Sequence, residues 1–273
     1  MKKFAPLLIA VLALSLLVTG CGSSTSNQPA KPAADKPIKI GATAGPQAEI
    51  LEAVKKVAEK DGIKIQIVEF TDYIQPNVAL NQGDIDMNSF QHQPYLDNMI
   101  NDRKFELVSI GKTVILPMGV YSKKVKNLAD VKPGSTVALP NDPTNGGRAF
   151  MLLEKTGLIK LKPNVGLKAA VTDIIENPKN LKFKELEAAQ IPRSLDDVDV
   201  AVINTNYAIE AKLVPTKDAI ALEDANSPYT CVIAVRTKDK DNPVFQKVVK
   251  AYQSEEVKKF VTEHFKGSIV AAW

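Results

Sequence analysis

The sequence predicts an α/β protein with two lobes that share a cleft, and two observations lead to this fold class. Near its start, two segments with the pattern of strands flank a segment with the periodicity of a helix, and a β-α-β order favours a sheet covered by helices. The same pattern restarts in the second half of the chain, with no long linker between the halves. Two such units indicate two lobes, and open α/β sheets bind ligands where their strands end.

The first unit begins with a predicted strand over residues 38–42, which opens onto a loop. Apolar residues then recur at helical spacing from Ile50 to Ala58, and Asp61-Gly62 is typical of a helix end. Isoleucines alternate with polar residues over 63–67, which predicts the second strand.

The later elements repeat this alternation, and polar loops follow the apolar strands. Strands are predicted over 136–139, 198–203 and 232–235. Helices are predicted after Asn145 and from Tyr207, and two more carry the apolar residues of 245–252 and 257–261.

Composition excludes several classes of function. Lys and Arg number 35 against 31 acidic residues, without a polybasic arm, so no nucleic-acid partner is expected. Two cysteines and two histidines are too few for a disulfide scaffold or a Cys/His metal site, and no cofactor is expected. Gly111-Lys112-Thr113 resembles the end of a phosphate-binding loop, but Glu106 stands where its first glycine is required. We therefore expect no enzyme.

The N-terminal segment has the pattern of an export signal over residues 1–20. Lys2 and Lys3 precede an apolar run over 4–18, which is too short for a membrane span and suits a signal peptide. The run ends at Val18-Thr19-Gly20-Cys21, which resembles a bacterial lipobox, so Cys21 is predicted to be acylated. Residues 21–37 would form the lipidated cysteine and a flexible tether. The body is therefore expected to be lipid-anchored on the extracytoplasmic face of the cell membrane.

Four stretches carry a resemblance to a known family: 70–77 (FTDYIQPN), 86–96 (DMNSFQHQPYL), 141–148 (NDPTNGGR) and 199–208 (DVAVINTNYA). They are similar to the MetQ/NlpA family, the methionine-binding lipoproteins of ABC importers, and the likeness runs over 38–273. The resemblance implies a two-lobed periplasmic-binding-protein fold of type II-like arrangement. It also implies delivery of methionine to a permease that a cytoplasmic ATPase drives. We expect lobe 1 to comprise 38–118 and 230–273, and lobe 2 to comprise 119–229.

The polar end of an amino acid needs partners for a carboxylate and an ammonium. Arg148 offers a planar fork of donors near a predicted helix start, where backbone N–H groups also favour an anion; the alternative is a surface ion pair. Asn204 ends an apolar strand, and its amide can accept from the ammonium or donate to the carboxylate; the alternative is a turn. Thr144 or Asn145 is expected to cap the helix, and Asn206 to be a turn or cap residue.

The resemblance places an aromatic cluster around the methionine side chain, made by Tyr73, Phe90, His92 and Tyr95. Thioether sulfur packs favourably against aromatic edges, and the rings can also cover the methylene groups. Spacing alone would favour plain core packing for these residues. His92 is expected to serve the core and also to direct one nitrogen toward the cleft.

Cys231 departs from the family pattern, which usually has Asn at this position in contact with the polar end of the ligand. A thiol is a weak donor that prefers apolar surroundings. The ligand is therefore expected to be methionine bound weakly, another amino acid, or a methionyl dipeptide. A surface antigen or adhesin with a vestigial cleft is the alternative from a different functional class.

Overall fold

The computed structural model describes residues 36–224 and 226–273. The predicted signal peptide, Cys21 and most of the tether lie outside the described residues. The body, Lys36–Trp273, forms one unit by its internal contacts. None of the helices in the described part of the chain has the length and apolarity that a membrane span needs.

The first sheet has the strand order β2-β1-β3-β13-β4. Strand β1 pairs in parallel with β2 and β3, whereas β13 returns from late in the chain and pairs antiparallel with β3 and β4. The strands are β1 (Ile38–Thr43), β2 (Ile65–Phe70), β3 (Met87–His92), β4 (Leu107–Lys112) and β13 (Cys231–Arg236).

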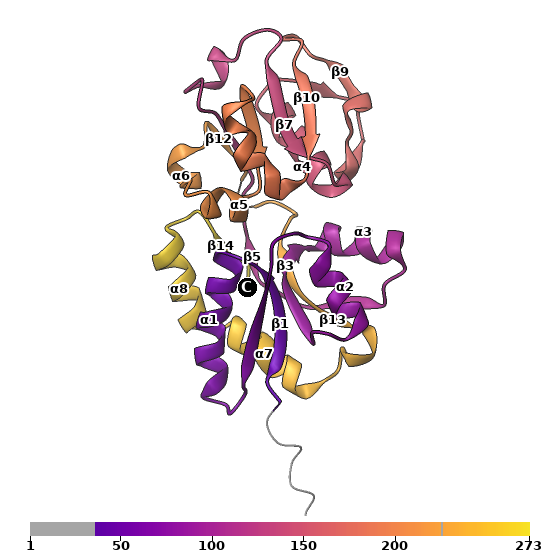
Figure 1. Cartoon of the computed structure of the whole chain (residues 1–273), viewed down its shortest axis with the longest axis vertical. Helices are drawn as coiled ribbons and strands as arrows, with labels where there is room; N and C mark the ends of the chain where they lie inside the picture. Colours follow the sequence, from indigo (N-terminus) through magenta and orange to yellow (C-terminus); the bar gives the residue numbers. More distant parts are fainter. Residues whose placement is uncertain (1–35, 225) are drawn as a thin grey trace, which may run out of the picture. The chain divides into compact units, whose positions relative to one another are not determined.

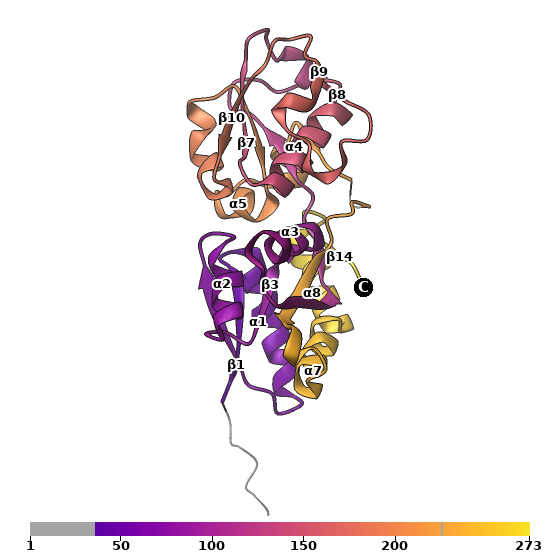
Figure 2. The same cartoon turned by 90° about the vertical axis from the view of Figure 1, so that its right-hand side faces the viewer.

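Helices cover both faces of this sheet (Figures 1 and 2). On one face lie α1 (Pro46–Glu59), α7 (Pro243–Tyr252) and α8 (Glu255–Phe265), whose buried residues Ile50, Val248 and Val257 pack with Ile40. On the other lie α2 (Gln75–Gln82) and α3 (Gln93–Arg103), where Leu80 and Leu96 pack against Val232. A short pair, β5 (Val114–Ile115) and β14 (Val270–Ala271), ties the C-terminal segment to this lobe.

The second sheet has the order β10-β7-β11-β6-β12. Strand β7 pairs in parallel with β10 and β11, while β6 pairs antiparallel with β11 and β12. The strands are β6 (Gly119–Tyr121), β7 (Thr136–Pro140), β10 (Lys182–Leu186), β11 (Val200–Ile203) and β12 (Ala221–Leu222).

This sheet is also covered on both faces. Helix α4 (Pro143–Lys155) packs on one face through Phe150 and Leu153. A 3₁₀ segment (Ala188–Asp196) and α5 (Thr205–Glu210) cover the other face. The remaining elements are α6 (Pro215–Asp218), the pair β8 (Lys160–Leu161) and β9 (Ile174–Glu176), and 3₁₀ turns at Leu128–Asp130, Gly166–Lys168, Val171–Asp173 and Thr237–Asp239.

The two sheets define two lobes, and the chain passes between them twice, from β5 to β6 and from β12 to β13. The predicted elements all form, with shifted ends: β2 begins at Ile65 and α5 at Thr205. The expected cap of α4 is wrong. Asp142, not Thr144 or Asn145, is the N-cap, because its carboxylate accepts the Asn145 backbone N–H at 2.9 Å and Pro143 occupies the first turn.

Candidate functional site

A pocket with an empty volume of about 350 Å³ lies where the strands of the two sheets end. The seven residues predicted to contact a ligand all line it: Tyr73, Phe90, His92, Tyr95, Arg148, Asn204 and Cys231. Six further residues complete the lining: Gln47, Gln91, Leu116, Asn145, Thr205 and Asn206. The lining residues therefore come from both lobes.

One end of the pocket is aromatic. The ring centroids of Tyr73, Phe90 and Tyr95 lie 6.0 to 6.2 Å from one another, so each ring contacts the other two. The Tyr95 hydroxyl donates to the Tyr73 backbone carbonyl at 3.0 Å, which fixes the loop that carries Tyr73. Met99 packs behind Phe90 and Tyr95. This end suits an apolar ligand group.

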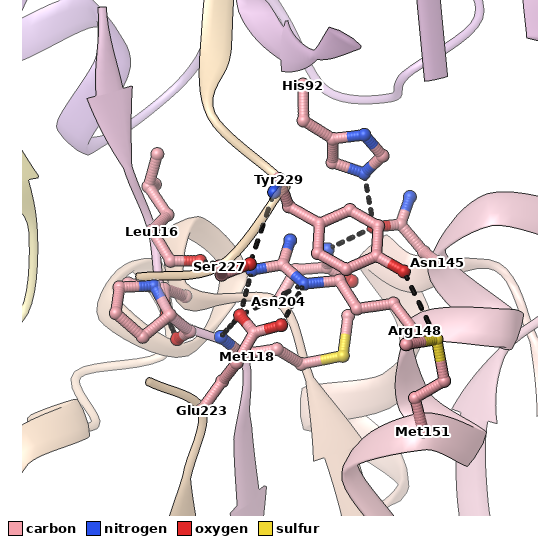
Figure 3. Close-up of polar contacts among 12 residues, drawn as sticks. His92, Leu116, Met118, Asn145, Arg148, Met151, Asn204, Glu223, Ser227 and Tyr229 are labelled. Carbon is pink, nitrogen blue, oxygen red and sulfur yellow. Dashed lines mark hydrogen bonds and ion pairs between the residues drawn. The ribbon is translucent and has the colours of Figure 1, made fainter. Parts of the chain in front are cut away.

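His92 connects the two lobes across the pocket. Its Nδ1 accepts the Tyr95 backbone N–H at 3.1 Å, as the N-cap of α3, so the proton of the neutral ring is assigned to Nε2. That nitrogen lies 3.1 Å from Asn145 Oδ1, to which it donates (Figure 3). Burial, and secondly the charge of Arg148, lowers the pKa of His92 to about 3, so the ring stays neutral. His92 thus reaches the pocket through Asn145 of the other lobe.

Arg148 lies at the polar end and is already paired with a carboxylate. Its Nε donates to both oxygens of Glu223 at 3.1 Å, and its Nη2 donates to Glu223 and to the Leu116 carbonyl. The guanidinium carbon lies 4.4 Å from the centroid of the Tyr229 ring (Figure 3). In the part of the chain that the structure describes, Nη1 is the amino group of Arg148 left without a protein acceptor. One edge of the fork therefore remains for a ligand.

Glu223 was not found by sequence reasoning, because no local pattern links it to Arg148. Arg148 is buried, with 4% exposure of its side chain, and Glu223 is largely buried, with 14% exposure. Glu223 also accepts the Met118 backbone N–H at 3.2 Å. The pairing gives Arg148 a role in the stability of the fold in addition to the role in ligand binding that the sequence predicted. Removal of either partner leaves a buried charge unpaired, which is strongly destabilising.

Two asparagines present unpartnered polar atoms. Asn204 donates its Nδ2 to Asn145 Oδ1 at 2.7 Å, which leaves its own Oδ1 buried without a partner among the described residues. Tyr73 donates its hydroxyl to Asn206 Oδ1 at 2.6 Å, which leaves Asn206 Nδ2 buried without one. Buried polar groups are almost always hydrogen-bonded. The pocket therefore suits a ligand that carries both a hydrogen-bond donor and a hydrogen-bond acceptor.

Asn145 and Asn206 were not predicted as pocket residues. Each was expected to be a cap or turn residue, as Asn commonly is near a helix start. The available signal was that each residue lies in the first turn of a helix that follows a strand end.

Cys231 begins β13 directly opposite His92 in the first sheet. It is buried, and its Sγ lies 3.9 Å from the Phe90 carbonyl. Burial raises the pKa of this thiol to about 12, so it stays protonated and uncharged. Its weak S–H donor is directed to the Phe90 carbonyl, so the thiol offers the pocket a mainly apolar surface.

An open groove of about 1930 Å³ adjoins the pocket and shares Tyr73 and Tyr95 with it. Tyr73 and Tyr207 lie at this boundary with ring centroids 5.0 Å apart, and the Tyr207 hydroxyl donates to the Thr71 carbonyl at 3.2 Å. Among the described residues, no group of His, Cys, Asp and Glu side chains is arranged to hold a metal ion.

The chain is similar to known lipoproteins and binding proteins over most of its length. The D-methionine-binding lipoprotein MetQ of Salmonella typhimurium is 49% identical over 275 residues, covering 100% of this chain and 98% of the relative. Outer membrane lipoprotein 3 of Mannheimia haemolytica is 46% identical, covering 99% of this chain and all of the relative. A nutrient binding protein from Burkholderia cenocepacia, solved bound to methionine, superposes with a TM-score of 0.85 and 57% identity over 86% of this chain and all of that one. The family model of the NlpA lipoproteins matches residues 38–273. This chain belongs to the NlpA lipoprotein family.

Proposed function

We propose that this protein is a lipid-anchored substrate-binding protein on the extracytoplasmic face of the cell membrane, which delivers methionine to an ABC importer. One observation carries the proposal: the pocket joins an aromatic end to a polar end where an acceptor and two donor groups lack partners among the described residues. Methionine matches this arrangement, with a thioether side chain, an ammonium and a carboxylate. Relatives of high identity over the full length are named for D-methionine binding.

Each part of the ligand would meet a different group of side chains. The carboxylate would accept from Arg148 Nη1 and Asn206 Nδ2, and the ammonium would donate to Asn204 Oδ1. The side chain would lie against the rings of Phe90 and Tyr95. All of these interactions bind and orient a ligand, so the proposed role is transport and not catalysis.

Closure of the two lobes would trap the ligand, a hinge motion typical of binding proteins. The proposed lobe boundaries remain 38–118 with 230–273 for lobe 1, and 119–229 for lobe 2. Delivery requires a permease driven by a cytoplasmic ATPase, and the closed lobes would dock on that permease.

Calorimetry with the purified protein in detergent tests the proposal. L-methionine and D-methionine are titrated separately, after unfolding and refolding to remove any ligand that co-purifies. We expect saturable binding of at least one of them, and mass spectrometry of the released material should identify the same compound. Absence of binding by both, with the protein folded, would refute the methionine assignment.

A second candidate ligand follows from Cys231. A thiol at the pocket wall, with its Sγ 3.9 Å from the Phe90 carbonyl, offers a ligand less hydrogen bonding than an amide would. A related amino acid or a methionyl dipeptide, whose polar atoms lie elsewhere, would not need an amide there. A thermal-shift panel of amino acids and methionyl dipeptides separates these ligands, because the best ligand gives the largest shift.

The anchor is tested through Cys21, which lies outside the described residues. A Cys21→Ala variant should lose acylation and move from the detergent phase to the aqueous phase in a phase-separation experiment. A variant that still enters the detergent phase as the wild type does would refute lipidation at this residue.

A further inference from the structure

We propose that Asp142, which does not line the pocket, is a positioning residue that makes Asn204 present an acceptor and not a donor to the ligand. The inference rests on the proposed function, because it concerns how the same pocket recognises the ammonium of an amino acid. It follows from the direction of hydrogen bonding along a chain of three side chains, Asp142, Asn145 and Asn204.

The chain of contacts begins at the N-cap of α4. Asp142 Oδ1 accepts the Asn145 backbone N–H at 2.9 Å and the Thr144 hydroxyl at 3.0 Å. Asn145 Nδ2 donates to Asp142 Oδ2 at 2.9 Å and to Oδ1 at 3.1 Å. An ionised carboxylate can only accept hydrogen bonds, so the Asn145 amide must turn its nitrogen toward Asp142.

The orientation of Asn145 then determines the next two groups. Its Oδ1 points away from Asp142 and accepts from His92 Nε2 at 3.1 Å and from Asn204 Nδ2 at 2.7 Å (Figure 3). Because Asn204 uses its nitrogen on Asn145, its Oδ1 is the atom left over. This oxygen belongs to a residue that is 7% exposed and lines the pocket, and it has no partner among the described residues.

The consequence is a preference for a ligand that donates at this point. An ammonium donates strongly to an amide oxygen, whereas a hydroxyl in its place forms a weaker neutral bond. Wild-type protein should therefore bind methionine more tightly than its 2-hydroxy analogue, in which a hydroxyl replaces the ammonium.

An Asp142→Asn variant should reverse the direction of the hydrogen bonds that run from Asp142 through Asn145 to Asn204. The cap oxygen stays in place, since the Asn145 backbone N–H and the Thr144 hydroxyl both donate to it, and Asn is as good an N-cap as Asp. The other oxygen becomes an NH₂ group that faces Asn145 Nδ2, donor against donor. Rotation of the Asn145 amide relieves this contact and turns the Asn204 N–H toward the ligand, and it also takes the acceptor away from His92 Nε2.

An Asp142→Ser variant is the matched control. It removes the same negative charge and keeps a capping oxygen, and its hydroxyl can turn its hydrogen away from Asn145, which the NH₂ group of Asn cannot do. Calorimetry with methionine and its 2-hydroxy analogue gives a ratio of affinities for each protein. We expect Asp142→Asn to lower this ratio by about tenfold or more, and Asp142→Ser to keep it within about threefold of wild type.

The outcomes separate this inference from the proposed function. If wild type binds methionine and Asp142→Asn keeps the wild-type ratio, the positioning role of Asp142 is refuted. If wild type binds no methionine, the proposed function fails, and the hydrogen-bond direction is then decided by NMR of the His92 ring in wild type. Protonation at Nε2 supports an Asn145 oxygen facing His92, and protonation at Nδ1 overturns it. The NMR measurement also decides the matter if Asp142→Asn does not fold.

Discussion

The pair of Arg148 and Glu223 has two roles that mutation can separate, one in folding and one in ligand binding. Arg148→Met leaves the Glu223 carboxylate buried without its partner, and Glu223→Leu leaves the guanidinium in the same state. Breaking a buried pair from one side costs about 3–5 kcal/mol, so each single variant should lose that much free energy of unfolding. Replacement of both by apolar residues of similar size is far less costly.

The double variant therefore should be more stable than the sum of the single losses predicts, by about 2 kcal/mol or more. It should still bind methionine at least about 30-fold more weakly than wild type, because the ligand carboxylate loses its charged donor. Urea denaturation of the four proteins measures the first quantity, and calorimetry measures the second.

An exposed ion pair near Arg148 and Glu223 provides a matched control. Lys155, also on α4, pairs with Asp224 at 2.7 Å, but both side chains are largely exposed, so the same cycle there should show little coupling. Additive losses at Arg148 and Glu223, within about 0.5 kcal/mol, would refute the structural role of the pair. Wild-type affinity in the double variant would remove Arg148 from the ligand site.

Three further predictions concern other pocket residues. Cys231→Asn should raise the affinity for methionine about ten- to a hundredfold in calorimetry if the thiol weakens binding of the polar end. If Cys231 is matched to another ligand, the same variant should weaken binding of the ligand that co-purifies. No change for either ligand means that Cys231 only packs in the core. The pKa of His92 is lowered from 6.5 to about 3, so its neutral form stabilises the fold above pH 6.5, and that stability is lost as pH falls toward 3. The loss of unfolding free energy approaches about 1.4 kcal/mol per pH unit. His92→Asn keeps the cap of α3, and urea denaturation at several pH values should show a shallower dependence of its unfolding free energy on pH. An unchanged dependence contradicts the assignment of this loss to His92. Tyr73→Phe removes the 2.6 Å bond to Asn206 and should speed methionine release about three- to tenfold in stopped-flow experiments, whereas an unchanged rate would show that this bond does not hold the lobes closed.

The elements of the fold could be predicted where one periodicity dominates a segment. The alternating isoleucines before β2 and the helical apolar spacing of α1 are examples, and their positions differ from the structure only at the ends. The place of β13 between β3 and β4 could not be predicted, because a strand pattern does not tell which distant strands it joins. Sequence order alone would have placed β4 beside β3.

Some of the pocket residues could also be predicted from the sequence, and others could not. Arg148 and Asn204 could be predicted because strand ends and helix starts mark ligand sites, and the aromatic residues followed from the family resemblance. Glu223 and the direction of the asparagine amides could not, since they depend on partners that only the folded chain brings together. The cap at Asp142 could have been predicted, because an acidic residue directly before a proline is typical of a helix start.

The strand that holds the first lobe together is the last of its five to be synthesised. Strands β3 and β4 do not pair with each other, and both pair with β13, whereas the second sheet takes all its strands from one continuous stretch. A chain that ends before Cys231 can therefore build the second sheet, but it leaves β3 and β4 with open edges and lacks part of the pocket wall. Unpaired edges of this kind are templates for aggregation. Premature termination or C-terminal proteolysis should thus yield aggregates or degraded chains and not a weakened binding protein.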